Sequence, residues 1–280
     1  MNRWIQLSML LIPAIGLLAC GLCFLHWLET KLVYPAPRGG VAVAAEHGAE
    51  EQFICSTDGT RVHAWFYSVP DATHTIVFFH GNGESIEFSG PWAGSLAKAL
   101  NANVMMFDYR GYGRSEGKPF ERGVVQDGIS VVDWVAARLN VPTQQLVYVG
   151  RSLGGGVAAQ VAISRPPKAL VMLSTFSSLI DVAGELMPWM PVRLIMKNQY
   201  ESSKALSRMD MPLLVVHGDS DRLVPLKLAK KMFEAAGSDR KQIRVLPGKG
   251  HNDLGMDDFL PAVNGFLEEV SAIENLGQRR

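Results

Sequence analysis

Cysteine is scarce in this sequence, and charge of neither sign is in excess. Three cysteines occur among 280 residues, and two of them, Cys20 and Cys23, lie in an apolar N-terminal run, which leaves Cys55 alone in the body. A single cysteine cannot form a disulfide framework or a cysteine-based zinc site there. The 27 acidic residues balance the 27 basic residues, so there is no electrostatic reason to expect a nucleic-acid partner.

Several motifs of cofactor-dependent enzymes are also missing. The chain has no His-Glu-x-x-His zinc motif and no Gly-Lys-Ser/Thr phosphate loop. The glycine clusters that begin at Gly81 and Gly111 have Ile86 and Glu116 where a dinucleotide fingerprint requires its third glycine. We therefore predict an activity that needs neither a cofactor nor a metal ion.

Apolar residues, by contrast, are abundant. Hydrophobic residues make up 48% of the chain and charged residues 19%, a composition that can bury a sizeable core and does not fit disorder. A chain of this length permits one large domain or two small ones.

The first long apolar run is at the N-terminus. Residues 4–28 contain no Asp, Glu, Lys or Arg, and as a helix they would span roughly 37 Å, enough to cross a bilayer core of about 30 Å. Pro13 is compatible with a membrane helix. We predict an uncleaved single-pass signal-anchor over 4–28. The flanking charges are too few to indicate which side of the membrane the body faces.

Two other interpretations of this run remain open. Leu17-Leu18-Ala19-Cys20 resembles the lipobox of a bacterial lipoprotein, and a cleaved secretory signal or a buried helix is a further alternative. Either kind of processing would make the protein a lipoprotein or a secreted or periplasmic one. The apolar character continues past Cys20, which favours the anchor because a cleaved apolar region is normally 7–15 residues long.

After a linker at 29–49, which includes the proline- and glycine-rich stretch Tyr34–Gly40, strand-like and helical patterns alternate through residues 50–273. The expected strands are Arg61–Tyr67, which should be partly exposed, and the apolar runs Thr75–Phe79, Val104–Phe107, Leu146–Val149, Ala169–Leu173, Leu213–Val216 and Ile243–Leu246. The expected helices are Pro91–Leu100, Phe120–Leu139, Leu153–Arg165, Pro225–Ala236 and Asp257–Ile273. This order predicts an α/β domain with a mostly parallel central sheet flanked by helices.

A segment at about 176–208 interrupts the alternation and is rich in Met, Pro and Trp. We predict a small inserted cap. Apolar side chains such as Met187, Trp189 and Met190 could receive an acyl chain or dock near the membrane. Alternatively, they could simply pack the cap onto the sheet.

A serine, an acid and a histidine come directly after three separate expected strands, where reactive groups of α/β proteins gather. Gly150-x-Ser152-x-Gly154 matches a nucleophile elbow, in which small flanking residues let strand and helix approach. The alternative is a glycine-rich helix start with Ser152 as its N-cap. His251, on a glycine-containing loop after the last strand, is the predicted general base.

Two acids compete for the role of orienting this histidine. Asp221 lies on the turn after Leu213–Val216, with Val224-Pro225 opening the next helix, and it is the better candidate for the Nδ1 partner of His251. Asp219 is more typical of a turn-forming residue. Of the other histidines, we interpret most of His26, His47, His63 and His74 as surface or hydrogen-bonded structural residues.

Several of these motifs resemble those of a known superfamily. Gly150-Arg151-Ser152-Leu153-Gly154, Asp221-Arg222-Leu223-Val224-Pro225 and Gly250-His251, in the order Ser, Asp, His, resemble the α/β-hydrolase superfamily. Asp108-Tyr109-Arg110-Gly111-Tyr112-Gly113-Arg114-Ser115 resembles a branch of membrane-anchored or secreted serine hydrolases, often called serine aminopeptidase-like, which includes palmitoyl-protein thioesterases.

One oxyanion-hole donor should be the backbone N–H of Leu153, directly after the nucleophile. The resemblance implies Asn82, the residue after His80-Gly81, as the second donor. The sequence thus predicts a serine hydrolase that cleaves a small-molecule or lipid-like acyl ester or thioester through an acyl-serine intermediate. An aminopeptidase-type amide hydrolase and a non-catalytic binding or scaffold protein of the same fold are the alternatives.

Overall fold

One eight-stranded sheet organises the body of the chain, in the strand order β1-β2-β4-β3-β5-β6-β7-β8. The computed structural model describes residues 3–37 and 42–277, with the side chains of 15–17, 19–37 and 42–273. The strands are β1 (Glu50–Cys55), β2 (Arg61–Tyr67), β3 (His74–Phe79), β4 (Ala102–Phe107), β5 (Leu146–Arg151), β6 (Ala169–Leu173), β7 (Leu213–Gly218) and β8 (Lys241–Leu246).

The strands from β3 to β8 pair in parallel, whereas β1 and β2 add an antiparallel edge. The parallel strands β5, β6 and β7 are almost continuously buried because helices cover both faces, which explains why they are apolar without alternation. The predicted α/β fold with a mostly parallel sheet is therefore confirmed.

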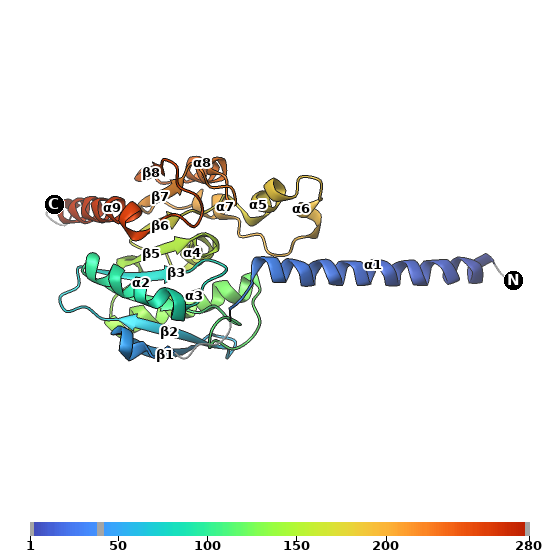
Figure 1. The fold of residues 1–280 in the computed structure, drawn as a ribbon, viewed down its shortest axis with the longest axis horizontal. Coiled ribbons are helices and arrows are strands. Elements are labelled where there is room, and N and C mark those ends of the chain that lie inside the picture. Colours follow the sequence, from blue (N-terminus) through green and yellow to red (C-terminus); the bar gives the residue numbers. More distant parts are fainter. Residues whose placement is uncertain (1–2, 38–41, 278–280) are drawn as a thin grey trace.

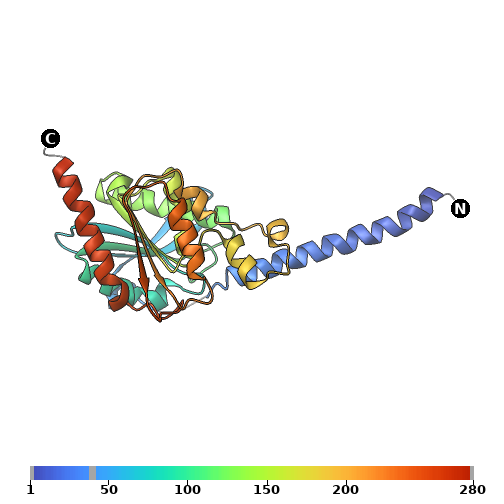
Figure 2. The same cartoon turned by 90° about the horizontal axis from the view of Figure 1, so that it is seen from above.

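Five helices cover the sheet (Figures 1 and 2). They are α2 (Ile86–Ala99), α3 (Glu121–Leu139), α4 (Leu153–Ser164), α8 (Leu226–Ala235) and α9 (Met256–Gly277). Buried residues of α3, α4 and α8 belong to one core cluster, and those of α2 and α9 to another. The sheet thus separates two cores, and side chains at its carboxyl edge are supported from both.

Three details differ from the expectations. β2 is buried at every position after Arg61 rather than partly exposed, because its side chains pack alternately into the cores on the two faces of the sheet. α2 starts at Ile86, ahead of Pro91, because the buried Asp108 carboxylate accepts the Ile86 N–H at 2.9 Å. β1 was not expected, since its exposed glutamates hide the strand pattern.

The N-terminal helix α1 (Arg3–Val33) extends away from the domain, and only its C-terminal end lies against it (Figures 1 and 2). The stretch Ile15–Val33 is long and apolar enough to cross a membrane, and little of it is buried in the protein. Helix therefore continues into the segment that the sequence assigned to a linker. Of that linker, residues 38–41 lie outside the described residues, and Ala44–His47 form a 3₁₀ helix, η1.

The inserted segment, the cap (residues 176–208), lies between β6 and β7, as expected. It forms α5 (Leu179–Leu186), α6 (Val192–Ile195) and α7 (Ser202–Leu206). α7 packs on α4 and α8, whereas α5 and α6 contact each other, and α6 also contacts α1. The outer part of the cap stands beside the end of α1, on the side of the domain from which that helix leaves (Figure 1).

Candidate active site

Three side chains from different loops meet at the carboxyl edge of the sheet. Ser152 follows β5, Asp221 follows β7 and His251 follows β8. The His251 Nε2 atom lies 2.9 Å from Ser152 Oγ, and its Nδ1 atom lies 2.7 Å from Asp221 Oδ2. The structure therefore brings together the three residues that the sequence selected, with each ring nitrogen of His251 facing the partner expected of it.

The backbone at Ser152 is strained, as a nucleophile elbow requires. Its φ of 51° and ψ of −119° lie where a non-glycine residue rarely occurs. A Cβ on Gly154 would meet the Phe79 carbonyl oxygen at 2.0 Å, so only glycine allows α4 to approach β3 this closely. The Ser152 side chain makes no capping bond to the helix and faces His251 instead, which argues against the N-cap alternative.

Asp221 is held in a tight turn. Its Oδ1 oxygen accepts the N–H groups of Leu223 at 3.0 Å and Val224 at 2.8 Å, which leaves Oδ2 directed at His251. Burial by itself would raise the pKa of this carboxyl group, but hydrogen bonds from His217, His251 and Val224 outweigh it and hold the pKa well below its usual range. Asp221 is thus an ionised partner for His251.

The competing acid has a different task. Asp219 Oδ1 accepts the Gly248 N–H at 2.7 Å, which fastens the turn after β7 to the loop that carries His251. His217 was not among the predicted site residues, yet it is fully buried and its Nε2 lies 3.4 Å from Asp221 Oδ2. Its i, i+4 spacing from Asp221 at a strand end was the available signal.

The expected oxyanion donors lie at the same place. Leu153 is the first residue of α4, so its N–H is one of the helix donors without an intrahelical acceptor. Leu153, Asn82 and Ser152 all line one pocket. A helix N-terminus also favours the negative charge that develops on a tetrahedral intermediate.

Tyrosines of the segment Asp108–Ser115 hold the loop that contains Asn82. Tyr112 Oη donates to the Asn82 carbonyl at 2.8 Å, and Tyr109 Oη donates to the His80 carbonyl at 2.8 Å. Burial raises the pKa of both phenols well above the usual value, so they remain protonated donors. The motif that suggested a family branch therefore supports the loop that contains Asn82.

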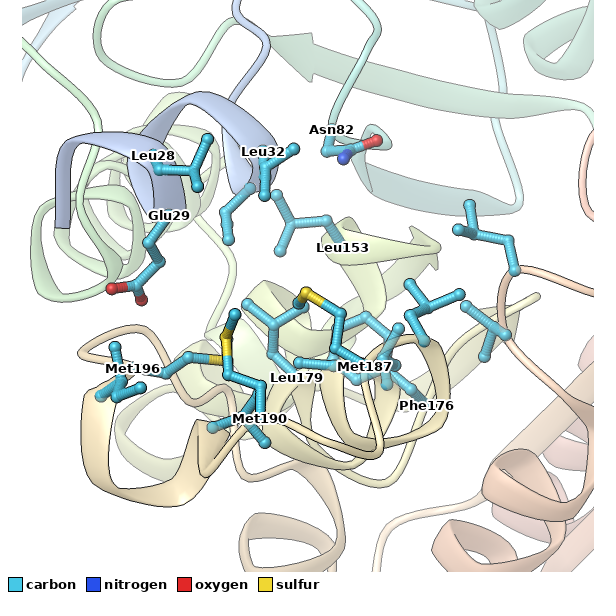
Figure 3. A pocket seen from close by; sticks show the side chains of 18 of the residues that line it. Leu28, Glu29, Leu32, Asn82, Leu153, Phe176, Leu179, Met187, Met190 and Met196 are labelled. Atoms are coloured by element: carbon cyan, nitrogen blue, oxygen red, sulfur yellow. The ribbon is translucent and has the colours of Figure 1, made fainter. Parts of the chain in front are cut away.

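Ser152 lies at the wall of a cavity of about 400 Å³, within the usual size range of small-molecule sites. Among its described lining residues, Glu29, Asn82 and Ser152 are the polar ones, and the rest are Leu153 of α4 and apolar residues of α1, the cap and the 221–224 turn. Figure 3 shows Leu28 and Leu32 of α1 across the cavity from Met187 and Met190 of the cap.

Two further histidines, His63 and His47, have structural surroundings. His63 is fully buried between Glu51, 2.8 Å from its Nε2, and Asp108. His47 stacks on Trp65. Within residues 3–37 and 42–277, no three His, Cys, Asp or Glu side chains gather in a way that could hold a metal ion.

Comparison with known proteins identifies the family to which the chain belongs. A family model described as alpha/beta hydrolase fold matches residues 74–194, and one described as serine aminopeptidase, S33 matches residues 192–257. The chain is 30% identical over 270 residues to an uncharacterized protein of Mycobacterium tuberculosis (strain ATCC 25618 / H37Rv), covering 94% of this chain and 95% of the relative. It is 29% identical over 251 residues to the alpha/beta hydrolase domain-containing protein WAV2 of Arabidopsis thaliana, covering 81% and 82%.

Solved structures share the fold at lower identity. An esterase of Pyrococcus furiosus superposes with a TM-score of 0.68 at 19% identity, covering 84% of this chain and 97% of the esterase. Est1E of Butyrivibrio proteoclasticus with bound ferulic acid gives a TM-score of 0.64 at 21% identity, covering 79% and 99%.

Fold and family agree: this is a hydrolase of the α/β-hydrolase fold. More specifically, the chain belongs to the α/β-hydrolase superfamily and carries a segment of the serine aminopeptidase type, as its motifs indicated.

Proposed function

We propose that the protein is a membrane-anchored serine hydrolase that cleaves an acyl ester or thioester. The observation that carries this proposal is the continuous hydrogen-bond chain from Ser152 Oγ through His251 to Asp221, at the wall of an apolar cavity. A serine hydroxyl is a weak nucleophile at neutral pH, and an adjacent base oriented by a carboxylate is the arrangement that activates it.

The proposed reaction runs in two halves. His251 Nε2 takes the proton of Ser152 Oγ as the oxygen attacks the acyl carbon, and the N–H groups of Leu153 and Asn82 bind the resulting oxyanion. His251 then returns the proton to the departing alcohol or thiol, which leaves an acyl-serine. Water repeats the sequence, releasing the acid and restoring Ser152.

The surroundings of Glu29 favour an ester or thioester over a peptide amine. An aminopeptidase needs a free carboxylate near the nucleophile to bind the α-ammonium group of its substrate. Glu29 is the carboxylate among the described lining residues. Its oxygens already accept the N–H groups of Lys197 and Asn198 and the Asn198 side-chain amide, at 2.8–3.2 Å.

The helix α1 supports the membrane part of the proposal. It has the length and apolarity of a single span, and side chains such as Ile15, Leu17 and Leu22 are exposed along it. Exposed apolar side chains on an isolated helix are typical of contact with lipid.

Labelling with a fluorophosphonate probe tests the catalytic proposal. The full-length protein should be labelled in a Ser152-dependent way, and the matched variant Ser152→Ala should not be labelled although it stays folded. A panel of acyl esters, acyl thioesters and aminoacyl amides should give the highest kcat/KM for an ester or thioester. Absence of labelling would instead favour a binding or scaffold protein, and preference for aminoacyl amides would favour the aminopeptidase alternative.

A further inference from the structure

One wall of the cavity beside Ser152 comes from the membrane helix itself. Leu25, Leu28, Leu32 and Val33 of α1 line it, opposite apolar residues of α5, α6 and their connection. The cavity reaches from these side chains to Ser152 and Leu153. The substrate site and the anchor are therefore one structure, rather than a domain joined to a separate tether.

A buried carboxylate fixes α1 in this position. Glu29 is 8% exposed, and one of its oxygens accepts the Asn198 N–H and the Asn198 Nδ2 amide, both at 2.8 Å. The Lys197 N–H donates to the same carboxylate at 2.9 Å. Figure 3 shows the Glu29 carboxylate turned aside from the apolar side chains that line the cavity.

A second layer of hydrogen bonds extends this contact into the domain. Asn198 Oδ1 accepts from Tyr34 Oη and from the N–H of Glu121, each at 2.9 Å, and Tyr34 Oη also lies 2.8 Å from Tyr200 Oη. Glu121 in turn accepts the N–H groups of Gln199 and Tyr200. The end of α1, the cap and the start of α3 are thus joined by charge-assisted and buried bonds, which are the stronger kinds.

The exposed surface of α1 and of the cap is apolar as well. Large side chains exposed on α1 and on the neighbouring cap include Phe24, Trp27, Leu32, Leu186, Trp189 and Leu194. Trp189 is 77% exposed and Leu194 is 87% exposed. Both come from the part of the cap that stands on the side where α1 leaves the domain (Figures 1 and 2).

The length of α1 indicates where its exposed side chains would lie in a bilayer. Residues 4–24 of α1 precede the cavity-lining residues and span roughly 32 Å at 1.5 Å per residue, which matches a hydrocarbon core of about 30 Å. Leu25 and the residues after it would then emerge at the membrane surface. Phe24 and Trp27, whose rings stack with centroids 5.9 Å apart, would lie at the interface that aromatic side chains prefer.

We propose that the substrate is a long-chain acyl lipid of the membrane in which α1 is anchored, and that its chain enters the cavity between α1 and the cap. Leu25, Leu28 and Leu32 form the wall along which the chain lies, so that its carbonyl reaches Ser152. Glu29 is a positioning residue, because it holds that wall against the cap. The proposal rests on the proposed function and adds to it the substrate class and the route of entry.

Replacing a cavity-lining leucine of α1 by a larger side chain tests whether α1 forms the wall that binds the acyl chain. The full-length protein and its variants are reconstituted in phosphatidylcholine vesicles and assayed with p-nitrophenyl butanoate and p-nitrophenyl palmitate. Wild type should prefer palmitate, since each further methylene that is buried raises kcat/KM about fourfold. Leu28→Trp should lower kcat/KM for palmitate at least tenfold and lower kcat/KM for butanoate far less, so that the preference for palmitate is lost, because the added indole occupies the part of the cavity that the long chain needs.

Two further variants make this result specific. Leu22→Trp places the same indole on α1 at an exposed position that does not line the cavity, and it should leave both rates unchanged. Leu32→Trp introduces it at a lining residue that is 58% exposed and so tolerates a larger side chain. It should repeat the selective loss even if Leu28→Trp impairs folding. Equal losses on both esters, or none with Leu32→Trp, would overturn the proposal.

Glu29→Ala tests the positioning role. Loss of the contact to Asn198 should raise KM for palmitate severalfold more than KM for butanoate, whereas a merely destabilised protein would lose activity on both esters equally. Binding of radiolabelled palmitate to vesicle-reconstituted Ser152→Ala separates this inference from the catalytic one. Palmitate bound by Ser152→Ala and displaced in Ser152→Ala/Leu28→Trp supports the chain site even if wild type hydrolyses neither ester. Failure to bind palmitate contradicts the chain site while leaving butanoate hydrolysis as the test of the serine hydrolase.

Discussion

The Nε2 atom of His217 lies 3.4 Å from Asp221 Oδ2, the same oxygen that accepts the hydrogen bond from His251 Nδ1. His217 also donates from Nε2 to the Val224 carbonyl at 2.8 Å. A fully buried histidine thus closes the turn that presents the carboxylate, and Asp221 Oδ2 lies between two imidazoles, of which His251 is the closer.

His217→Phe should lower both turnover and stability. The substitution leaves the Val224 carbonyl without its donor, which costs about 1–3 kcal/mol when the group is buried, and it loosens the Asp221 turn. Urea denaturation should report the loss in unfolding free energy, and kcat should fall because His251 is less well oriented. A variant with normal stability and normal kcat would show that His251 alone suffices to hold the acid.

Asp221→Asn should reduce turnover by roughly 10⁴ with little change of fold, because the imidazole loses its tautomer and its charge partner. Asp219→Asn should be mild, since its carboxylate contacts the Gly248 N–H and not His251. Steady-state kinetics of the two variants decide between the acids. The opposite order of effects would transfer the orienting role to Asp219.

The low pKa of Asp221 also predicts how stability depends on pH. Because the pKa is lower in the folded protein than the value of about 3.9 in an unfolded chain, ionised Asp221 stabilises the fold above that pH, and the stabilisation is lost as pH falls through the folded value. The difference in unfolding free energy between wild type and Asp221→Asn should therefore narrow below about pH 4. Chemical denaturation at several pH values measures it, and a constant difference would contradict the lowered pKa.

Ser152 and His251 should act as one unit. Ser152→Ala, His251→Ala and the double variant should each lose about 10⁴–10⁶ in turnover, because removing either partner removes the same proton-transfer pathway. The remaining rate comes from the oxyanion donors. The Ser152→Ala variant should be as stable as wild type or slightly more stable, because the substitution relieves a strained polar elbow. If the double variant loses the product of the single losses, the two residues work independently.

Arg110→Met should destabilise the domain by about 3–5 kcal/mol, because it leaves a buried carboxylate unpaired. Arg110 binds Asp127 through Nε and Nη2, at 2.7–3.2 Å, and Asp127 is fully buried. The matched control is Arg138→Met, which breaks a half-exposed pair with Glu50 and should change stability by about 0–1 kcal/mol. Thermal unfolding of both variants checks the difference.

The full-length protein should remain with membranes after alkaline carbonate extraction, as an uncleaved span does. Mass spectrometry of the purified protein should show an unprocessed N-terminal segment. A mature terminus at a lipid-modified Cys20 would identify a lipoprotein instead, and a mature terminus beyond α1 would identify a secreted protein.

The sheet and the positions of the reactive loops could be predicted because of burial. Strands covered on both faces are continuous apolar runs, and β6 coincides with the expected Ala169–Leu173. β1 could not be found in this way, because an edge strand beginning with two exposed glutamates has no apolar signal. Likewise Ser152, His251 and Asp221 come just after strands in sequence, so the topology itself indicated that they meet.

The role of α1 in the cavity could not be predicted. Glu29 contacts backbone N–H groups of a loop 168 residues later in the chain, and backbone donors have no sequence signature. The apolar run ends at Leu28 in the sequence, and residues 29–49 were expected to form a linker. Only the structure shows that Glu29, the charged residue directly after that run, helps to form the wall of the cavity.

If α1 spans a membrane as proposed, the bonds at Glu29 make a stiff joint between that span and the domain. A flexible linker would let the domain turn freely above the lipid, but here Glu29 in the last turns of α1 is hydrogen-bonded to the cap, and so is Tyr34 directly after the helix. In a bilayer, a helix longer than the local hydrocarbon thickness tilts, and a domain fixed to its end must tilt with it. Bilayer thickness would thereby set the angle at which Ser152 faces the lipid surface, so that lipid composition could tune the enzyme without any bound regulator.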